Sequence, residues 1–94
     1  MQFEIEIQFE RISLQMRLRG VGHDKHYRDI RAGDWPKIIK DGRNSNGLKH
    51  EREAICAAKA AGANKDEVRA LVKELEELRS RLLKAWRERI QNAS

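Results

Sequence analysis

The feature that most constrains this chain is a long run of periodic apolar residues between positions 65 and 91. These residues recur at steps of three and four, which is the periodicity of an α-helix. They are Val68, Leu71, Leu75, Leu78, Leu82, Trp86 and Ile90. Asn64 fits the N-cap position, and Glu67 three residues later completes a capping-box pattern. A helix of this length spans ~40 Å, so we expect it to extend past the rest of a 94-residue chain.

A second, alanine-rich helix is predicted at 48–61, directly before the long one. Gly62 is a natural helix stop, and only Ala63 separates it from the Asn64 cap. The two helices should therefore form a tight antiparallel pair that covers the long helix as far as about Leu78. The remaining stretch, 79–91, would project with apolar side chains that require a cover.

The N-terminal segment, 2–19, alternates polar and apolar residues with one change of phase. Its apolar positions are Phe3, Ile5, Ile7 and Phe9, followed by Ile12, Leu14, Met16 and Leu18. A two-residue turn at Glu10 and Arg11 would place all eight on one face of a β-hairpin. A single bent strand with a bulge is the alternative.

A short helix is predicted at 34–41, because Asp34 can cap it and Pro36 is tolerated in a first helical turn. Trp35, Ile38 and Ile39 would point inward. Residues 41–47 are polar and turn-forming, so we expect an exposed loop there. The predicted fold class is α+β: one domain over 1–94 with a β-hairpin, a short helix and a helical hairpin whose C-terminal helix is long.

The chain is basic, with 20 Lys and Arg against 15 Asp and Glu and a net charge of +5. This balance favours nucleic acid, an acidic protein surface or an anionic membrane. No apolar run approaches the roughly 18 residues of a membrane span, so no membrane association is expected. The N-terminus does not resemble a signal peptide, and Cys56 alone cannot form an internal disulfide. We expect a cytoplasmic protein.

Few residues suggest catalysis or metal binding. His23 and His26 lie three apart near Asp24, but a closed zinc site needs about four ligands. Cys56 and His50 are six positions apart and would not share a helix face. No phosphate-binding loop or nucleophile–base spacing is present. We therefore expect a protein that is not an enzyme and has neither a metal nor another cofactor.

The first functional hypothesis is contact with another protein through the basic, Trp-bearing end of the long helix. Trp and Arg are common anchors of such surfaces. The candidate residues are Arg79, Leu82, Leu83, Trp86, Arg87 and Ile90. The role would be that of an inhibitor or adaptor, and the small size would suit an accessory protein of a phage or mobile element. A homodimer is also open, because the long helix is acidic in its first half and basic in its second.

The second hypothesis is DNA or RNA binding by a basic loop and a helical corner. Ala58, Gly62, Val68 and Leu71 resemble the spacing of a DNA-binding helix-turn-helix, although any tight helical corner needs similar residues. Asp66 and Glu67 oppose this hypothesis, because they would face the phosphates. The candidate residues are Lys37, Lys40, Arg43, Lys49, Arg52, Lys65 and Arg69.

Overall fold

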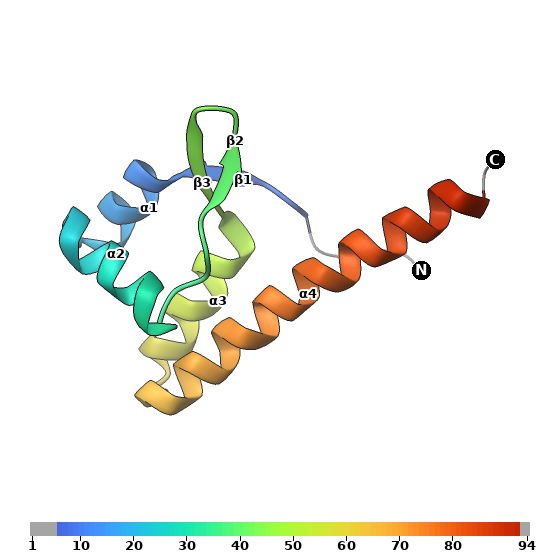
Figure 1. The fold of residues 1–94 in the computed structure, drawn as a ribbon. Helices are drawn as coiled ribbons and strands as arrows, with labels where there is room; N and C mark the ends of the chain where they lie inside the picture. The colour runs from blue at the N-terminus through green and yellow to red at the C-terminus, as the bar shows by residue number, and fades with distance from the viewer. Residues whose placement is uncertain (1–5, 93–94) are drawn as a thin grey trace.

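The computed structural model describes residues 6–92 and confirms the α+β class (Figure 1). Three short antiparallel strands form one sheet in the order β1-β3-β2. In the described part of the chain four helices accompany them, and the last projects well past the body. The elements are β1 (Phe9–Arg11), α1 (Ile12–Arg19), α2 (His23–Ala32), β2 (Ile39–Asp41), β3 (Asn44–Leu48), α3 (Lys49–Ala60) and α4 (Lys65–Asn92).

The N-terminal hairpin predicted for 2–19 is wrong over its described part, and so is the bent single strand. Residues 12–19 form helix α1, and only Phe9–Arg11 are extended, paired with β3 from Phe9 opposite Leu48 to Arg11 opposite Asn46. Gln15, expected on the solvent side, is 1% exposed, whereas Leu18 is 53% exposed. Leu, Met, Gln and Arg are good helix formers, and here that preference outweighs the alternating pattern. Residues 2–5 of the prediction lie outside the described residues.

The short helix predicted for 34–41 is also wrong. The chain instead forms α2 earlier, ends it at Gly33 with a left-handed φ of 83°, and continues into β2 at Ile39. Trp35 does point inward, as predicted. The expected loop at 41–47 is mostly strand β3, joined to β2 by the two residues Gly42 and Arg43. Gly42 has a φ of 62°, as the first position of a type II′ hairpin turn requires.

The helical hairpin formed by α3 and α4 confirms the two C-terminal predictions. The capping box is present: Glu67 N–H donates to Asn64 Oδ1 at 2.8 Å, and Asn64 N–H donates to Glu67 Oε1 at 3.0 Å. The core lies where α3, α4 and the segment after α2 meet. Its buried members are Trp35, Ile55, Val68, Val72 and Leu75. The predicted resemblance to a helix-turn-helix lies at the corner between α3 and α4, and there Val68 is buried in the core.

Candidate functional site

The first two helices are joined by a short turn, and this pair of helices was not predicted. Three residues, 20–22, join α1 to α2. Gly20 makes the turn with a φ of 71°, and its N–H donates to Arg17 O at 3.1 Å. Val21 N–H donates to Met16 O at the same distance. A short turn containing Gly is one feature of the DNA-binding helix-turn-helix motif.

Buried polar contacts fix α2 against α1. Arg19 Nη2 donates to Asp29 Oδ2 at 2.6 Å, and Arg19 Nη1 lies 2.8 Å from His26 Nδ1. The same guanidinium lies 4.1 Å from the centre of the Trp35 ring. Burial raises the pKa of Asp29, but hydrogen bonds from Lys25 and Arg19 outweigh it, so the net pKa is lowered. The Asp29 carboxylate is therefore ionised, and its charge is balanced by the two ion pairs with Arg19 and Lys25.

The opposite side of α2 is exposed and mostly basic. Arg28 and Arg31 are exposed, and neither forms an ion pair with any residue in the described range 6–92. His23 stacks on Tyr27 with ring centroids 4.3 Å apart. Asp24 is the acidic side chain on this surface, and it lies 3.5 Å from His23 Nδ1. This face of α2 offers two free guanidinium groups beside an aromatic pair.

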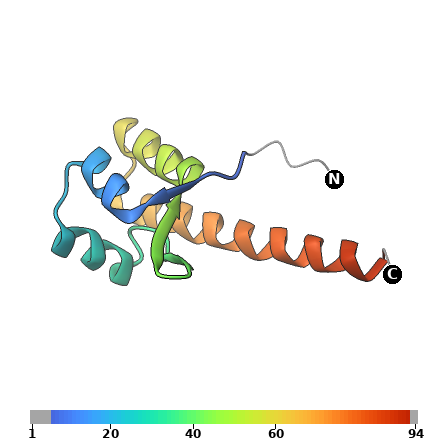
Figure 2. The ribbon, with the colours of Figure 1, turned by 90° about the horizontal axis from the view of Figure 1, so that it is seen from above.

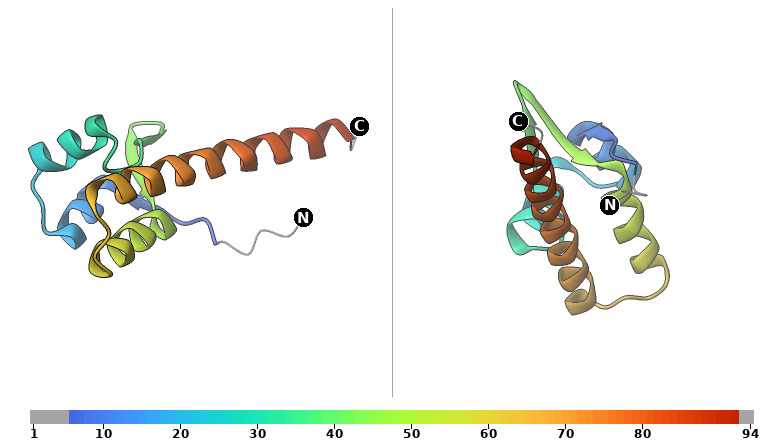
Figure 3. Two further views of the ribbon diagram at one scale, coloured as in Figure 1. Left: turned by 90° about the horizontal axis from the view of Figure 1, so that it is seen from below. Right: turned by 90° about the vertical axis from the view of Figure 1, so that its right-hand side faces the viewer.

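The β2–β3 hairpin projects on the same side of the molecule as α2, with α3 on the other side (Figures 2 and 3). Arg43 lies in its turn and is exposed. Lys40 Nζ donates to Ser45 Oγ at 2.8 Å, and Arg11 Nη1 reaches Asn44 Oδ1 at 2.6 Å from the neighbouring strand. The hairpin therefore presents cations close to its tip, on the side to which α2 also projects.

The seven residues predicted for nucleic-acid contact do not form one surface. Lys37, Lys40 and Arg43 lie on the hairpin or on the segment leading into it. Lys49 begins α3, and Lys65 is exposed at the start of α4. Two others are engaged in ion pairs: Arg52 Nε lies 2.8 Å from Glu10 Oε1, and Arg69 Nε lies 2.7 Å from Asp34 Oδ1.

Arg28 and Arg31 were not predicted, because the apolar residues of 20–33 show no regular pattern. A signal was nevertheless present. Gly22 and Gly33 bracket ten residues in which the buried positions His26 and Asp29 and the partly buried Ile30 recur at helical spacing. The buried positions are polar, however, and a search for apolar periodicity does not detect them.

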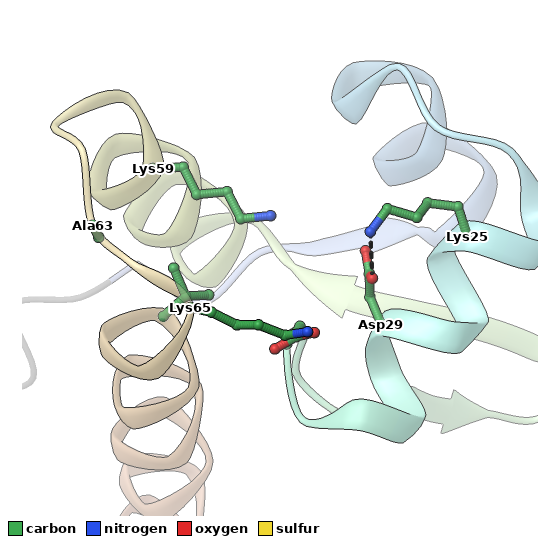
Figure 4. Close-up of a pocket in the computed structure, with 7 residues that line it drawn as sticks. Lys25, Asp29, Lys59, Ala63 and Lys65 are labelled. Atoms are coloured by element: carbon green, nitrogen blue, oxygen red, sulfur yellow. Dashed lines mark hydrogen bonds and ion pairs between the residues drawn. The ribbon is translucent and has the colours of Figure 1, made fainter.

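A cavity of about 400 Å³ lies between α2 and the α3–α4 corner (Figure 4). Its charged lining residues are Lys25, Asp29, Asp34, Lys59 and Lys65. The two carboxylates are already paired, Asp29 with Arg19 and Lys25, and Asp34 with Arg69. Within residues 6–92, no group of three or more His, Cys, Asp or Glu is placed to hold a metal ion.

The residues predicted for protein contact lie along the projecting end of α4. Trp86 is 58% exposed, Ile90 is 49% exposed, and Leu83 and Arg87 are also exposed, while Leu82 is partly buried. Arg79 differs from the others. Its Nε and Nη2 atoms donate to the two oxygens of Glu51, at 2.8 and 2.5 Å, and its Nη1 donates to Lys37 O at 3.0 Å. Arg79 therefore anchors α4 to the body.

Comparisons of the chain with protein-family models, with curated proteins and with solved structures found no significant match. Within residues 6–92, no helix combines the length and the apolar character needed to cross a bilayer.

Proposed function

We propose that this protein binds double-stranded DNA, with α2 in the major groove and the β2–β3 hairpin against the neighbouring backbone. The observation that carries the proposal is the helix–turn–helix formed by α1 and α2, whose outer face presents Arg28 and Arg31. In such motifs the second helix enters the major groove. Arginine is suited to this position because its guanidinium can contact guanine in two places or bind phosphate.

The two parts of this surface have different roles. Side chains on the outer face of α2 reach base edges, and Tyr27 adds a flat surface that suits a thymine methyl or a sugar. Lys40 and Arg43 on the hairpin bind phosphates, which fixes the register of the protein on the duplex without reading sequence. Lys37 lies just before β2 and extends the same basic strip.

The α1–α2 unit is better suited to DNA than the α3–α4 corner. At that corner, Asp66 and Glu67 are exposed in the first turn of α4 and would repel phosphates. In α2, Asp29 is held by Arg19 and Lys25, and Asp24 is the exposed acidic residue of the first turn. The first turn of α2 therefore presents one carboxylate to a polyanion, and the first turn of α4 presents two.

The test is fluorescence anisotropy with a labelled random-sequence duplex. Affinity should fall by about 100-fold from about 50 to about 200 mM salt if four phosphates are contacted. The double substitution Arg28→Glu with Arg31→Glu should weaken binding by at least ~30-fold.

Lys59→Glu with Lys65→Glu is the matched control, because it makes the same change in net charge at the α3–α4 corner. It should weaken binding by no more than ~3-fold. Equal losses in the two double variants would contradict the placement of the site. No binding by the unaltered protein at low salt would contradict the function itself.

The projecting end of α4 supports a second role, contact with another polypeptide. The observation in its favour is the exposure of Trp86 and Ile90, since large apolar side chains gathered on one surface commonly mark an interaction site. An adaptor that binds DNA through one end and a protein through the other would use both surfaces.

A further inference from the structure

The apolar side chains at the end of α4 continue the stripe that forms the core. At about 3.6 residues per turn, Leu82, Trp86 and Ile90 fall on the same side of the helix as Val72 and Leu75. The body covers this stripe only as far as Arg79, which is held by Glu51. Beyond Arg79, Leu82 is still partly buried, whereas Trp86 and Ile90 are about half exposed, and Figure 1 shows α4 continuing away from the body.

The charges beside the exposed stripe are positive. Residues 80–92 contain Arg81, Lys84, Arg87 and Arg89, with Glu88 as the one acidic residue. Helical geometry places Arg87 on one side of the stripe and Arg89 on the other. Arg81, Lys84 and Glu88 fall on the far side of the helix, away from the stripe. A helix packed on this stripe would therefore meet an arginine along each edge.

We infer that this stripe binds an acidic amphipathic helix of another protein, whose apolar ridge covers Leu82, Leu83, Trp86 and Ile90. Carboxylates flanking that ridge would pair with Arg87 and Arg89, as charges flanking a coiled-coil seam do. The inference rests on the second role proposed for this surface and is independent of DNA binding, because the surface lies on the part of α4 beyond the body.

The charge pattern disfavours a second copy as the occupant. Two copies packed through their projecting ends would gather Arg87 and Arg89 twice around one seam with no carboxylate on its edges. The acidic half of α4 cannot serve as the counterpart, because its apolar side is already buried in the body through Val68, Val72 and Leu75. A flat surface is disfavoured too, since the stripe continues the side of α4 that packs on the body through Val72 and Leu75.

The test uses a synthetic amphipathic peptide of about 18 residues, long enough to span the stripe. It carries Leu at helical a and d positions and Glu on both flanks. Two further peptides have Lys in place of Glu or a scrambled order. In a titration followed by fluorescence anisotropy, the protein should bind the Glu-flanked peptide at least ten-fold tighter than either of the others. Trp86→Glu should lose at least ten-fold in affinity, whereas Trp86→Phe should stay close to the unaltered protein.

Charge reversal provides the sharpest control. Arg87→Glu with Arg89→Glu should reverse the preference, so that the Lys-flanked peptide binds better. Arg81→Glu with Lys84→Glu makes the same change in net charge on the far side of the helix and should leave the preference unchanged. Equal binding of the Glu- and Lys-flanked peptides would overturn the inference. So would self-association of the unaltered protein that Trp86→Glu abolishes, measured by sedimentation equilibrium, because it would assign the stripe to a second copy. None of these measurements involves DNA, so their failure leaves the proposed DNA binding standing.

Discussion

At the level of single residues, His26 is the buried group most sensitive to pH. Its side chain is fully buried, and Nε2 has no hydrogen-bond partner among residues 6–92. Burial and the adjacent Arg19 guanidinium lower the pKa of His26 to about 4, with Asp29 acting in the opposite direction. The folded protein therefore holds the His26 ring in its neutral form. Arg19 donates a hydrogen bond to Nδ1, and a proton added at Nδ1 would face the Arg19 cation.

His26 makes the fold sensitive to mild acid. The unfolded chain takes up this proton near pH 6.5, whereas the folded protein does so only near 4. Between these values the unfolded state binds more protons, so stability falls as the pH is lowered and the loss levels off below 4. The free energy of unfolding at pH 5 should be about 2 kcal/mol lower than at neutral pH.

Urea unfolding at a series of pH values measures this loss. His26→Gln is the control, because its side-chain oxygen can still accept from Arg19 but does not titrate. The variant should show a flat profile between about pH 6.5 and 5. A slope that persists in His26→Gln would show that another group is responsible.

At the level of elements, α1 is the part of the fold for which the sequence was most misleading. Its alternating Ile12, Leu14, Met16 and Leu18 suggested a strand, yet its deeply buried side chains are Ile12 and Gln15. Gln15 Nε2 donates to Glu10 Oε1 and to Leu48 O, and Trp35 Nε1 donates to Gln15 Oε1. A polar side chain that fixes a helix through three tertiary hydrogen bonds leaves no trace in an apolar pattern.

Gly47 in β3 allows this close packing of α1. A Cβ built on Gly47 would overlap the Gln15 amide, which its buried hydrogen bonds hold in place. Gly47→Ala should therefore lower the free energy of unfolding by roughly 1–3 kcal/mol. Gly22→Ala is the control: Gly22 has a φ of −83° and open space around its Cβ position, so its change should stay within about 1 kcal/mol. If Gly47→Ala and Gly22→Ala lower the free energy of unfolding equally in chemical unfolding, the Gln15 side chain can move aside for the added methyl group.

The elements that the sequence did predict are those whose determinants are local. Asn64 and Glu67 cap α4 within one turn, and the apolar spacing along α4 needs no partner to be recognised. The same reasoning located Leu83, Trp86 and Ile90 on the projecting end. By contrast, the position of α2 depends on Arg19, Asp29 and Trp35, which meet only in the folded chain. The helix–turn–helix was missed because polar tertiary contacts define its inner side.

At the level of the whole molecule, Arg79 marks the boundary between the body and the projecting end of α4. Its side chain donates three hydrogen bonds to the body and balances the charge of Glu51, which is 2% exposed. Helix residues beyond it contribute little burial to the body, since Leu83, Trp86 and Ile90 are about half exposed. DNA binding and partner binding should therefore be separable by truncation.

Two truncations ending on either side of Arg79 test this separation. A chain ending at Ser80 keeps the Glu51–Arg79 pair, so its free energy of unfolding should stay within about 1 kcal/mol and its DNA affinity within about 3-fold, while peptide binding is lost. A chain ending at Glu77 leaves the Glu51 carboxylate buried without its cation, which should cost about 3–5 kcal/mol. Urea unfolding and duplex anisotropy on both chains provide the measurements. If the chain ending at Ser80 unfolds as readily as the shorter one, the projecting end of α4 stabilises the body directly and cannot be a free binding surface.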